Sequence, residues 1–173
     1  MTRVYIPATL AILQQLVADG SLRVVAGTAF AVTPTLREAY AEGDDEELAE
    51  VALRDAALGS LRLLASDEPD DGRDLHGDLP LRRAVLVADV DAVTPRPDLD
   101  DAVVKVGQPV ALDDVVAAYV DTAAAEPAVR AAMAVIDAAD LGDEDSELTV
   151  GDAQDHDLAW YAAGELPFLL ELL

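Results

Sequence analysis

The stretch RRAVLVADV, residues 82–90, gives the strongest strand signal in the chain. It is a short apolar run that is rich in valine, a residue type that favours the pleated backbone of a sheet. Further strands are predicted at RVYIP, residues 3–7, where Pro7 is expected to end the strand, and at AVVKVGQPV, residues 102–110. Residues 22–32 are also extended in character. VVAAYVD, residues 115–121, suits either a strand or a helix face, and its density of valine favours the strand. A sheet is therefore expected at the centre of the fold.

Capping residues predict helices between these strands. Thr9, Thr33 and Asp44 each precede a stretch with helical character, and Asp44 is followed by Glu47 at the spacing of a capping box. Near the C-terminus, Pro167 is expected to break or kink the last helix. The predicted helices cover residues 10–19, 34–42, 45–65 and 126–141, with a last helix that begins near Asp155 or Asp157.

This order of elements predicts an α+β fold, with a single mixed or antiparallel sheet of about four to five strands covered by helices. A chain of 173 residues can bury one core, so residues 1–173 are expected to form a single globular domain with an acidic mobile loop at 66–80. The first twenty residues lack the basic and small-residue signals of a secretory leader, and no uncharged run could span a bilayer. A cytoplasmic location is the expectation.

The charge balance narrows the classes of partner. The chain has 35 acidic and 11 basic residues, a net charge of -24, and a hydrophobic fraction of 52%. That apolar content is typical of a folded chain rather than a disordered one. Such an acidic surface repels phosphate backbones and anionic lipids, so neither nucleic acid nor a membrane is expected as a partner, whereas a basic protein is.

Several common catalytic and metal-binding motifs are excluded. The chain has no cysteine, and its single lysine, Lys105, is followed by Val106 rather than by the Ser or Thr of a phosphate-binding loop. No pair of glycines has the spacing of a dinucleotide-binding turn, and no serine has the flanking glycines of a nucleophile elbow. Neither a zinc site nor any cofactor is predicted.

The acidic stretch GDEDSELTVGDAQDHDLAWY, residues 142–161, resembles part of a calcium-binding loop. Asp143, Asp145 and Glu147 alternate as calcium ligands do. Leu148, however, occupies the position that needs a glycine, and Gln154 the position that needs a bidentate glutamate. We therefore predict no metal site here and interpret the stretch as a solvated loop that leads into the last helix.

His156 is the candidate acid or base of this stretch. Between Asp155 and Asp157 it could act as a general base, with Glu165 as a partner on the following helix. The alternative is that one of these aspartates caps the helix and His156 is exposed at its start. No nucleophile can be placed near His156 from the sequence, which favours the alternative.

Other candidate contacts lie outside this stretch or at its end. Arg37, on a short helix with Tyr40, could anchor an anion, or it could pair with a neighbouring acid. Trp160 is expected to be an anchor in the core or at an interface. The candidate ligand or partner contacts are Arg37, Tyr40, His156, Trp160 and Glu165.

The C-terminal segment LPFLLELL, residues 166–173, is unusually apolar for a terminus. It is expected to pack either on the core of its own chain or across the interface of a homodimer. Phe168, Leu169 and Leu172 are the candidate interface residues.

Four segments together carry a family resemblance. RVYIPATL, AFAVTPTLREAYAEGDDEELAEVAL, RRAVLVADV and HDLAWYAAGELPFLL resemble a family of small uncharacterised actinobacterial proteins, classed as a domain of unknown function. The resemblance covers nearly the whole chain and implies a cytoplasmic single domain. It implies no activity, cofactor or catalytic residue.

Two functional hypotheses follow. The first is a non-enzymatic interaction or regulatory protein that presents an acidic surface to a basic partner, with a homodimer as one arrangement. The alternative is a hydrolase or transferase that uses carboxylates, with or without Mg²⁺. An enzyme requires Arg37, Tyr40, His156 and Glu165, or similar groups, to converge in a pocket, whereas an interaction protein does not.

Overall fold

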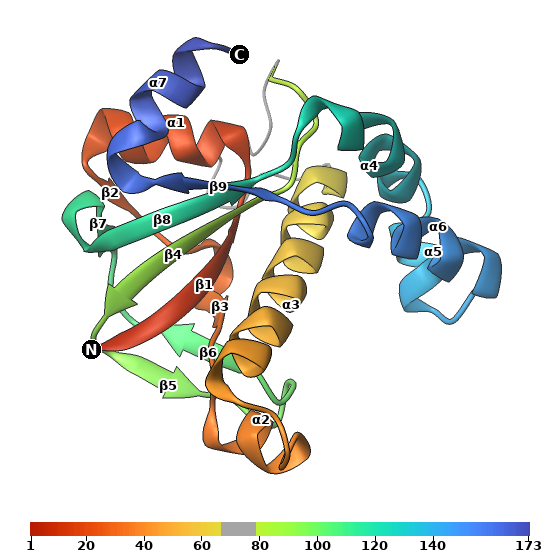
Figure 1. The fold of residues 1–173 in the computed structure, drawn as a ribbon, viewed down its shortest axis with the longest axis horizontal. Coiled ribbons are helices and arrows are strands. Elements are labelled where there is room, and N and C mark those ends of the chain that lie inside the picture. Colours follow the sequence, from red (N-terminus) through yellow and green to blue (C-terminus); the bar gives the residue numbers. More distant parts are fainter. Residues whose placement is uncertain (67–78) are drawn as a thin grey trace.

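The computed structural model describes residues 1–66 and 79–173. Seven strands of this part of the chain form one sheet, in the order β5-β6-β3-β1-β4-β8-β9, and every neighbouring pair is antiparallel (Figure 1). The predicted α+β class is confirmed, but the predicted number of strands is too small. The sheet strands are β1 (Thr2–Ala8), β3 (Thr28–Phe30), β4 (Ala84–Val90), β5 (Val93–Pro95), β6 (Val103–Val106), β8 (Val115–Val120) and β9 (Ala159–Ala162). A separate pair is formed by β2 (Ser21–Leu22) and β7 (Val110–Ala111). Most of the acidic loop expected at 66–80 falls on residues 67–78, outside the described part.

Strand β4, which residues 82–90 predict, is a central strand of the sheet, because it lies between β1 and β8. Its side chains alternate between two cores. Leu86 packs with the residues of α1 (Leu10–Asp19), whereas Val85 and Val87 pack with those of α3 (Asp45–Ala65). A strand that is buried on both faces reads as a continuous apolar run, which explains why residues 82–90 gave so clear a signal.

Pro7 does not end the first strand, as was predicted. It lies within β1, in register with Val85 of β4. A proline is tolerated there because β1 meets its other neighbour, β3, only at Tyr5 and Phe30. Helix α3 crosses this point closely: a Cβ added to Gly59 would lie 2.8 Å from Pro7 Cγ. The absence of a side chain at Gly59 therefore permits the close packing of helix on strand.

The predicted helix starts at Thr9 and Asp44 are confirmed. The Thr9 side chain accepts a hydrogen bond from the backbone N–H of Ile12, and the Asp44 side chain accepts one from that of Glu47. These caps satisfy backbone donors that the first helical turn leaves open. The third predicted start, at Thr33, is confirmed too, although α2 (Pro34–Ala39) ends earlier than the predicted residue 42.

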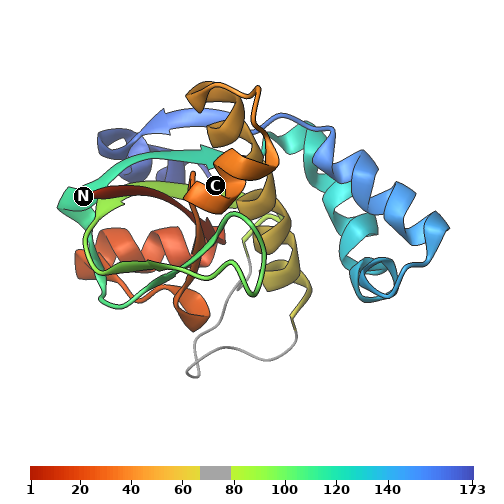
Figure 2. The same ribbon diagram turned by 90° about the horizontal axis from the view of Figure 1, so that it is seen from below.

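Ser60 joins α3 to the middle of the sheet. Its buried hydroxyl donates to the carbonyl of Ala8 at 2.6 Å and accepts from the N–H of Ala84 at 2.9 Å. One side chain thus satisfies backbone groups on β1 and at the start of β4, while α1 covers the opposite face (Figure 2).

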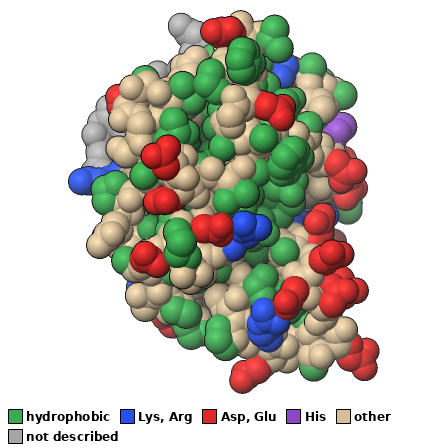
Figure 3. All heavy atoms as spheres, turned by 60° about the vertical axis from the view of Figure 1, so that its left-hand side comes forward, with side chains coloured by type: hydrophobic (Ala, Val, Ile, Leu, Met, Phe, Trp, Pro, Cys, Tyr) green, Lys and Arg blue, Asp and Glu red, His purple; other side chains and the backbone are tan. Residues whose placement is uncertain are grey.

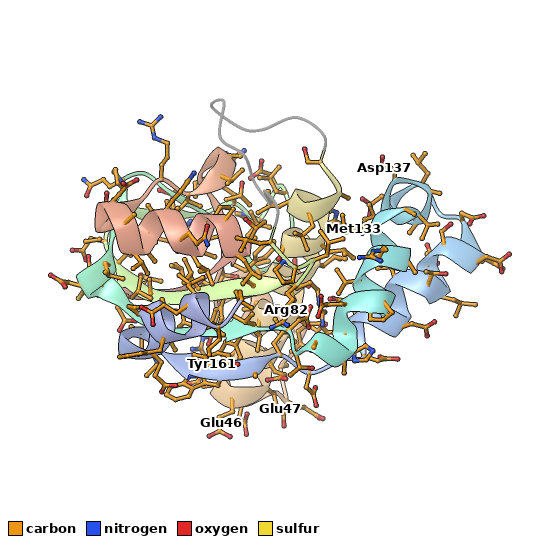
Figure 4. All side chains as sticks on the ribbon, turned by 90° about the horizontal axis from the view of Figure 1, so that it is seen from above. Glu46, Glu47, Arg82, Met133, Asp137 and Tyr161 are labelled. Carbon is orange, nitrogen blue, oxygen red and sulfur yellow. The ribbon has the colours of Figure 1, made fainter. Side chains whose placement is uncertain are left out.

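Three helices stand beside α3, at the side of the sheet, in both ribbon views: α4 (Glu126–Met133), α5 (Ile136–Asp140) and α6 (Glu144–Gln154) (Figures 1 and 2). Arg82 links them to the sheet through its ion pair with Glu126, 3.4 Å away, and lies between the sheet and α4 (Figure 4). The single helix predicted over 126–141 is wrong in one respect, because it breaks between α4 and α5 at Ala134 and Val135.

The prediction for residues 142–157 is wrong. The expected solvated loop is helix α6, capped by Asp143, which accepts a hydrogen bond from the N–H of Ser146. The negative side chains of its first turn interact favourably with the positive end of the helix dipole and so stabilise the helix. The expected last helix from Asp155 or Asp157 is instead strand β9. The final helix, α7 (Leu166–Glu171), begins later and has Pro167 in its first turn, where proline is compatible with a helix.

The apolar C-terminal segment packs in part on its own chain. Leu166 and Leu169 of α7 belong to the same core as α1, and Leu169 is 7% exposed. Phe168 and Leu172 are exposed. Within the described residues, no helix has both the length and the hydropathy to cross a membrane.

Candidate functional site

A cleft of about 340 Å³ lies between α3 and the segment that joins α6 to β9. This size is within the range of ligand-binding pockets. The cleft combines apolar walls with ionisable groups from four elements or their ends. It is lined by Glu50, Leu53, Arg54 and Ala57 of α3, Arg83 before β4, Tyr119 of β8, and Gln154, His156, Asp157 and Leu158.

Arg83, which lines the cleft, forms a buried ion pair with Asp121. Arg83 is 1% exposed, and its Nε and Nη2 donate to the two carboxylate oxygens of Asp121 at 2.9 and 2.8 Å. The backbone N–H of Arg83 also donates to Asp121. Two buried charges require this degree of pairing, because each loses its hydration in the interior.

The same guanidinium positions the segment that borders the cleft. Nη1 of Arg83 donates to Oε1 of Gln154 at 2.7 Å, and Nη2 donates to the carbonyl of His156 at 2.9 Å. Gln154 in turn donates to the carbonyl of Arg54 on α3. These hydrogen bonds fix the end of α6 to both the sheet and α3. They also hold the turn that contains His156 at the border of the cleft.

His156 does line the cleft, but it follows the end of α6 rather than beginning a helix. The predicted exposed position at a helix start is therefore wrong, since the residue is half-buried. Its neighbour Asp155 lies 3.9 Å from Nη2 of Arg54 in an exposed ion pair. Among the described residues, no group of three or more His, Cys, Asp or Glu side chains is placed to hold a metal ion.

Two carboxylates of the cleft are uncommitted. Glu50 and Asp157 are exposed, and neither forms an ion pair with any residue that the structure describes. The arginines of the cleft are engaged elsewhere, Arg83 with Asp121 and Arg54 with Asp155. A cationic group that enters the cleft would therefore meet free negative charge.

An aromatic pair continues the cleft toward the edge of the sheet. Tyr119 lines the cleft and is in direct register with Trp160 on β9. Residues paired in this way project to the same face, so the indole lies on the α3 side of the sheet. Trp160 is 56% exposed and belongs to the accessible surface beside the cleft.

The remaining candidates from the sequence lie elsewhere. Arg37 forms an exposed ion pair with Asp45 at the start of α3, and Tyr40 is half exposed at the end of α2. Glu165 is exposed in the turn before α7. Of the four groups whose convergence an enzyme would need, only His156 lines the cleft.

One acid has a strongly shifted pKa. Burial raises the pKa of Asp55 on α3 to about 6, with a further rise from the charge of Asp100 and an opposing effect from Arg62 and Arg54. Asp55 is not part of the cleft lining. Its shift therefore marks a desolvated position on the helix and not an acid aimed into this cavity.

A second hollow, of about 410 Å³, lies between residues 23–27 and 106–109. Within the described structure its lining has one ionisable side chain, Arg23, and one polar amide, Gln108, and the other residues are glycine or apolar. It is larger than the cleft between α3 and β9 but has fewer groups that could recognise a ligand.

Residues 2–170 match the model of a family of unknown function, DUF6912. No curated protein and no solved structure matches the chain.

Proposed function

Since the chain belongs to DUF6912, a family of unknown function, we propose from its geometry that it is a non-enzymatic binding module for positively charged proteins. The partner contacts the cleft between α3 and β9. The observation that carries the proposal is the pair of uncommitted carboxylates, Glu50 and Asp157, beside the aromatic pair Tyr119 and Trp160. We place this binding in the cytoplasm, the compartment expected from the sequence.

The overall charge supports this proposal. A net charge of -24 attracts basic surfaces over long range and raises the rate at which they associate. On the face drawn in Figure 3, carboxylates are spread among apolar patches, and basic side chains near its centre lie against them. Glu46 and Glu47 at the start of α3 point away from the molecule into solvent (Figure 4).

The composition of the cleft also suits a basic side chain. A Lys or Arg of the partner can bind a carboxylate while its cationic group lies on an aromatic face, an arrangement that is favourable near Trp and Tyr. The scattered positions of Arg37, Tyr40 and Glu165 support a binding module over the carboxylate hydrolase or transferase, because the latter needs these groups together.

The fluorescence of Trp160, the single tryptophan, provides the test. A short peptide of alternating valine and lysine is titrated into the protein at low ionic strength. Replacing both cleft carboxylates (Glu50→Gln with Asp157→Asn) should weaken binding about fivefold, as expected for the loss of two exposed ion pairs.

The matched control is Glu38→Gln with Glu42→Gln, which removes the same charge from exposed positions on and after α2. It should change the affinity little. Equal effects of the two double variants would show attraction by net charge alone, and the absence of any binding to the lysine peptide would overturn the proposed function.

A further inference from the structure

We propose that the partner binds as an extended strand, which adds to the free edge of β9 and extends the sheet. This inference rests on the proposed function, because it assigns a binding mode to the same basic partner. It adds backbone hydrogen bonds between the partner and β9 to the charge attraction of the proposed function. The occupant is a segment with alternating apolar and basic residues.

The edge of β9 is open to such an addition. β9 is the last strand in the order of the sheet, and it is paired only with β8 among the described strands. The pairing with β8 runs without a register shift from Ala159 to Ala162, so the backbone is regular along its length. The opposite edge strand, β5, contains Pro95, which is a common way to block edge pairing. The sequence of β9, AWYA, contains neither proline nor charge.

The side chains of β9 fit an alternating partner. Trp160 lies on the α3 face beside the cleft, while Tyr161 packs against the core on the α1 face. An added strand would place successive side chains on these two faces in turn. Every second residue of the partner would then lie on the face that carries the exposed indole, and the residues between would lie on the α1 side.

Charge selects the occupant. Asp157 precedes β9 and Glu165 follows it, and neither forms an ion pair within the described part of the chain. A second copy of this chain would bring another net charge of -24 to the same edge. Like charges placed side by side disfavour an interface, whereas Lys or Arg on the added strand would lie against carboxylates. The observations therefore favour a basic segment over self-pairing through β9.

The experiment compares the alternating valine and lysine peptide with two backbone variants of it, studied with the unmodified protein. One variant carries N-methyl groups on the odd-numbered residues and the other on the even-numbered residues. In an added strand only alternate N–H groups point to β9. One N-methylated peptide should therefore lose about tenfold or more in affinity while the other is affected much less. Amide exchange of residues 159–162, followed by NMR, should slow when the unmodified peptide binds.

Each other outcome is informative. If the unmodified peptide binds but the two N-methylated peptides do so equally well, and exchange in β9 is unchanged, strand addition is overturned and the proposed function stands. If the unmodified peptide does not bind at low ionic strength, the proposed function itself fails. If the protein alone forms a dimer, measured by light scattering, and exchange in β9 slows with protein concentration, the edge is taken by a second copy and the basic occupant is overturned.

Discussion

Arg83 and Asp121 form a two-point ion pair in the interior, with N–O distances of 2.9 and 2.8 Å and with both side chains almost fully buried. A pair with nearly the same geometry, Arg96 and Asp98, lies on the surface at 2.9 and 2.8 Å. The two pairs share this geometry but differ in solvent exposure and in the further hydrogen bonds that Arg83 donates to Gln154 and to the carbonyl of His156, so one chain contains both a buried, networked pair and an exposed pair.

Asp121→Asn should lower the free energy of unfolding by about 3–5 kcal/mol, because it leaves the Arg83 charge buried without its counter-ion. Asp98→Asn, at the exposed pair, should have a far smaller effect because water solvates Arg96 when its partner is lost. Urea denaturation monitored by circular dichroism gives both values. Similar losses in the two variants would contradict the view that Arg83 depends on Asp121.

Gly59→Ala should destabilise the protein by about 1–3 kcal/mol, since the new Cβ would lie 2.8 Å from Pro7 Cγ and push α3 away from β1. Gly151→Ala is the matched control, because it lies in α6 and its added Cβ would have nothing within 4 Å. That variant should stabilise the helix by about 0.5–1 kcal/mol. Opposite signs for the same substitution in thermal denaturation are the expected result, and a stabilising Gly59→Ala would show that the contact between α3 and β1 is loose.

The parts of the fold that the sequence predicted correctly are those with local causes. Thr9 and Asp44 cap helices through hydrogen bonds to residues three positions later, so the signal lies within a few residues. The run at 82–90 contains a strand that is buried on both faces, and burial on both faces requires consecutive apolar residues, which are visible in the sequence. The strand at 115–121 was likewise confirmed as β8.

The errors have causes that are not local. Helix α6 buries only a few small side chains, among them Val150 and Ala153, against a core that includes Val129 of α4. Because most of this helix is exposed and acidic, it has too few apolar residues at helical spacing for the sequence pattern to predict it. β5 and β9 are too short to show alternation of apolar and polar residues. They form because each pairs with a neighbouring strand, β5 with β6 and β9 with β8.

The candidate site was only partly accessible from the sequence. His156 and Trp160 were selected as rare residue types, and the structure places one in the cleft and the other beside it. The buried pair at the cleft, Arg83 with Asp121, was missed because the two residues are 38 positions apart in the chain. A contact of that kind follows from the pairing of β4 with β8 and not from any motif.

The raised pKa of Asp55 gives a prediction for the pH dependence of stability. Between the ordinary pKa of 3.8 and about 6, the folded state holds a proton that the unfolded state has lost. The contribution of this group to stability is therefore largest at low pH and falls as pH rises through that window. Asp55→Asn removes the cost of a buried charge, so the variant should be more stable than the native protein at neutral pH.

Denaturation at about pH 7.5 and about pH 4.5 tests this, because the advantage of the Asn variant should shrink at the lower pH. Asp98→Asn is the control, and its effect should be nearly the same at these two pH values. A hydrogen bond from Arg96 lowers the pKa of Asp98, so the contribution of this group to stability is present above the ordinary pKa of 3.8 and is lost only as the pH falls below that value. An advantage of Asp55→Asn that is constant with pH would mean that packing, and not charge, is the cause.

Trp160→Ala separates binding from folding. The indole is 56% exposed on an edge strand, so its removal should change the free energy of unfolding by less than about 1 kcal/mol. The same change should weaken binding of the valine and lysine peptide about two- to fivefold, since an exposed aromatic face contributes that much to holding a cation. Calorimetric titration is suitable here, because the variant lacks the fluorescent reporter.

Phe168→Ala provides the control for this variant, because Phe168 is similarly apolar and 68% exposed but lies on α7, outside the cleft lining. Peptide affinity should not change. The same variant tests the alternative in which the C-terminal segment forms a homodimer: light scattering would then show that Phe168→Ala, alone or with Leu172→Ala, reduces the mass of the native particle. Loss of peptide binding in Phe168→Ala, with Trp160→Ala unaffected, would move the binding surface from β9 to α7.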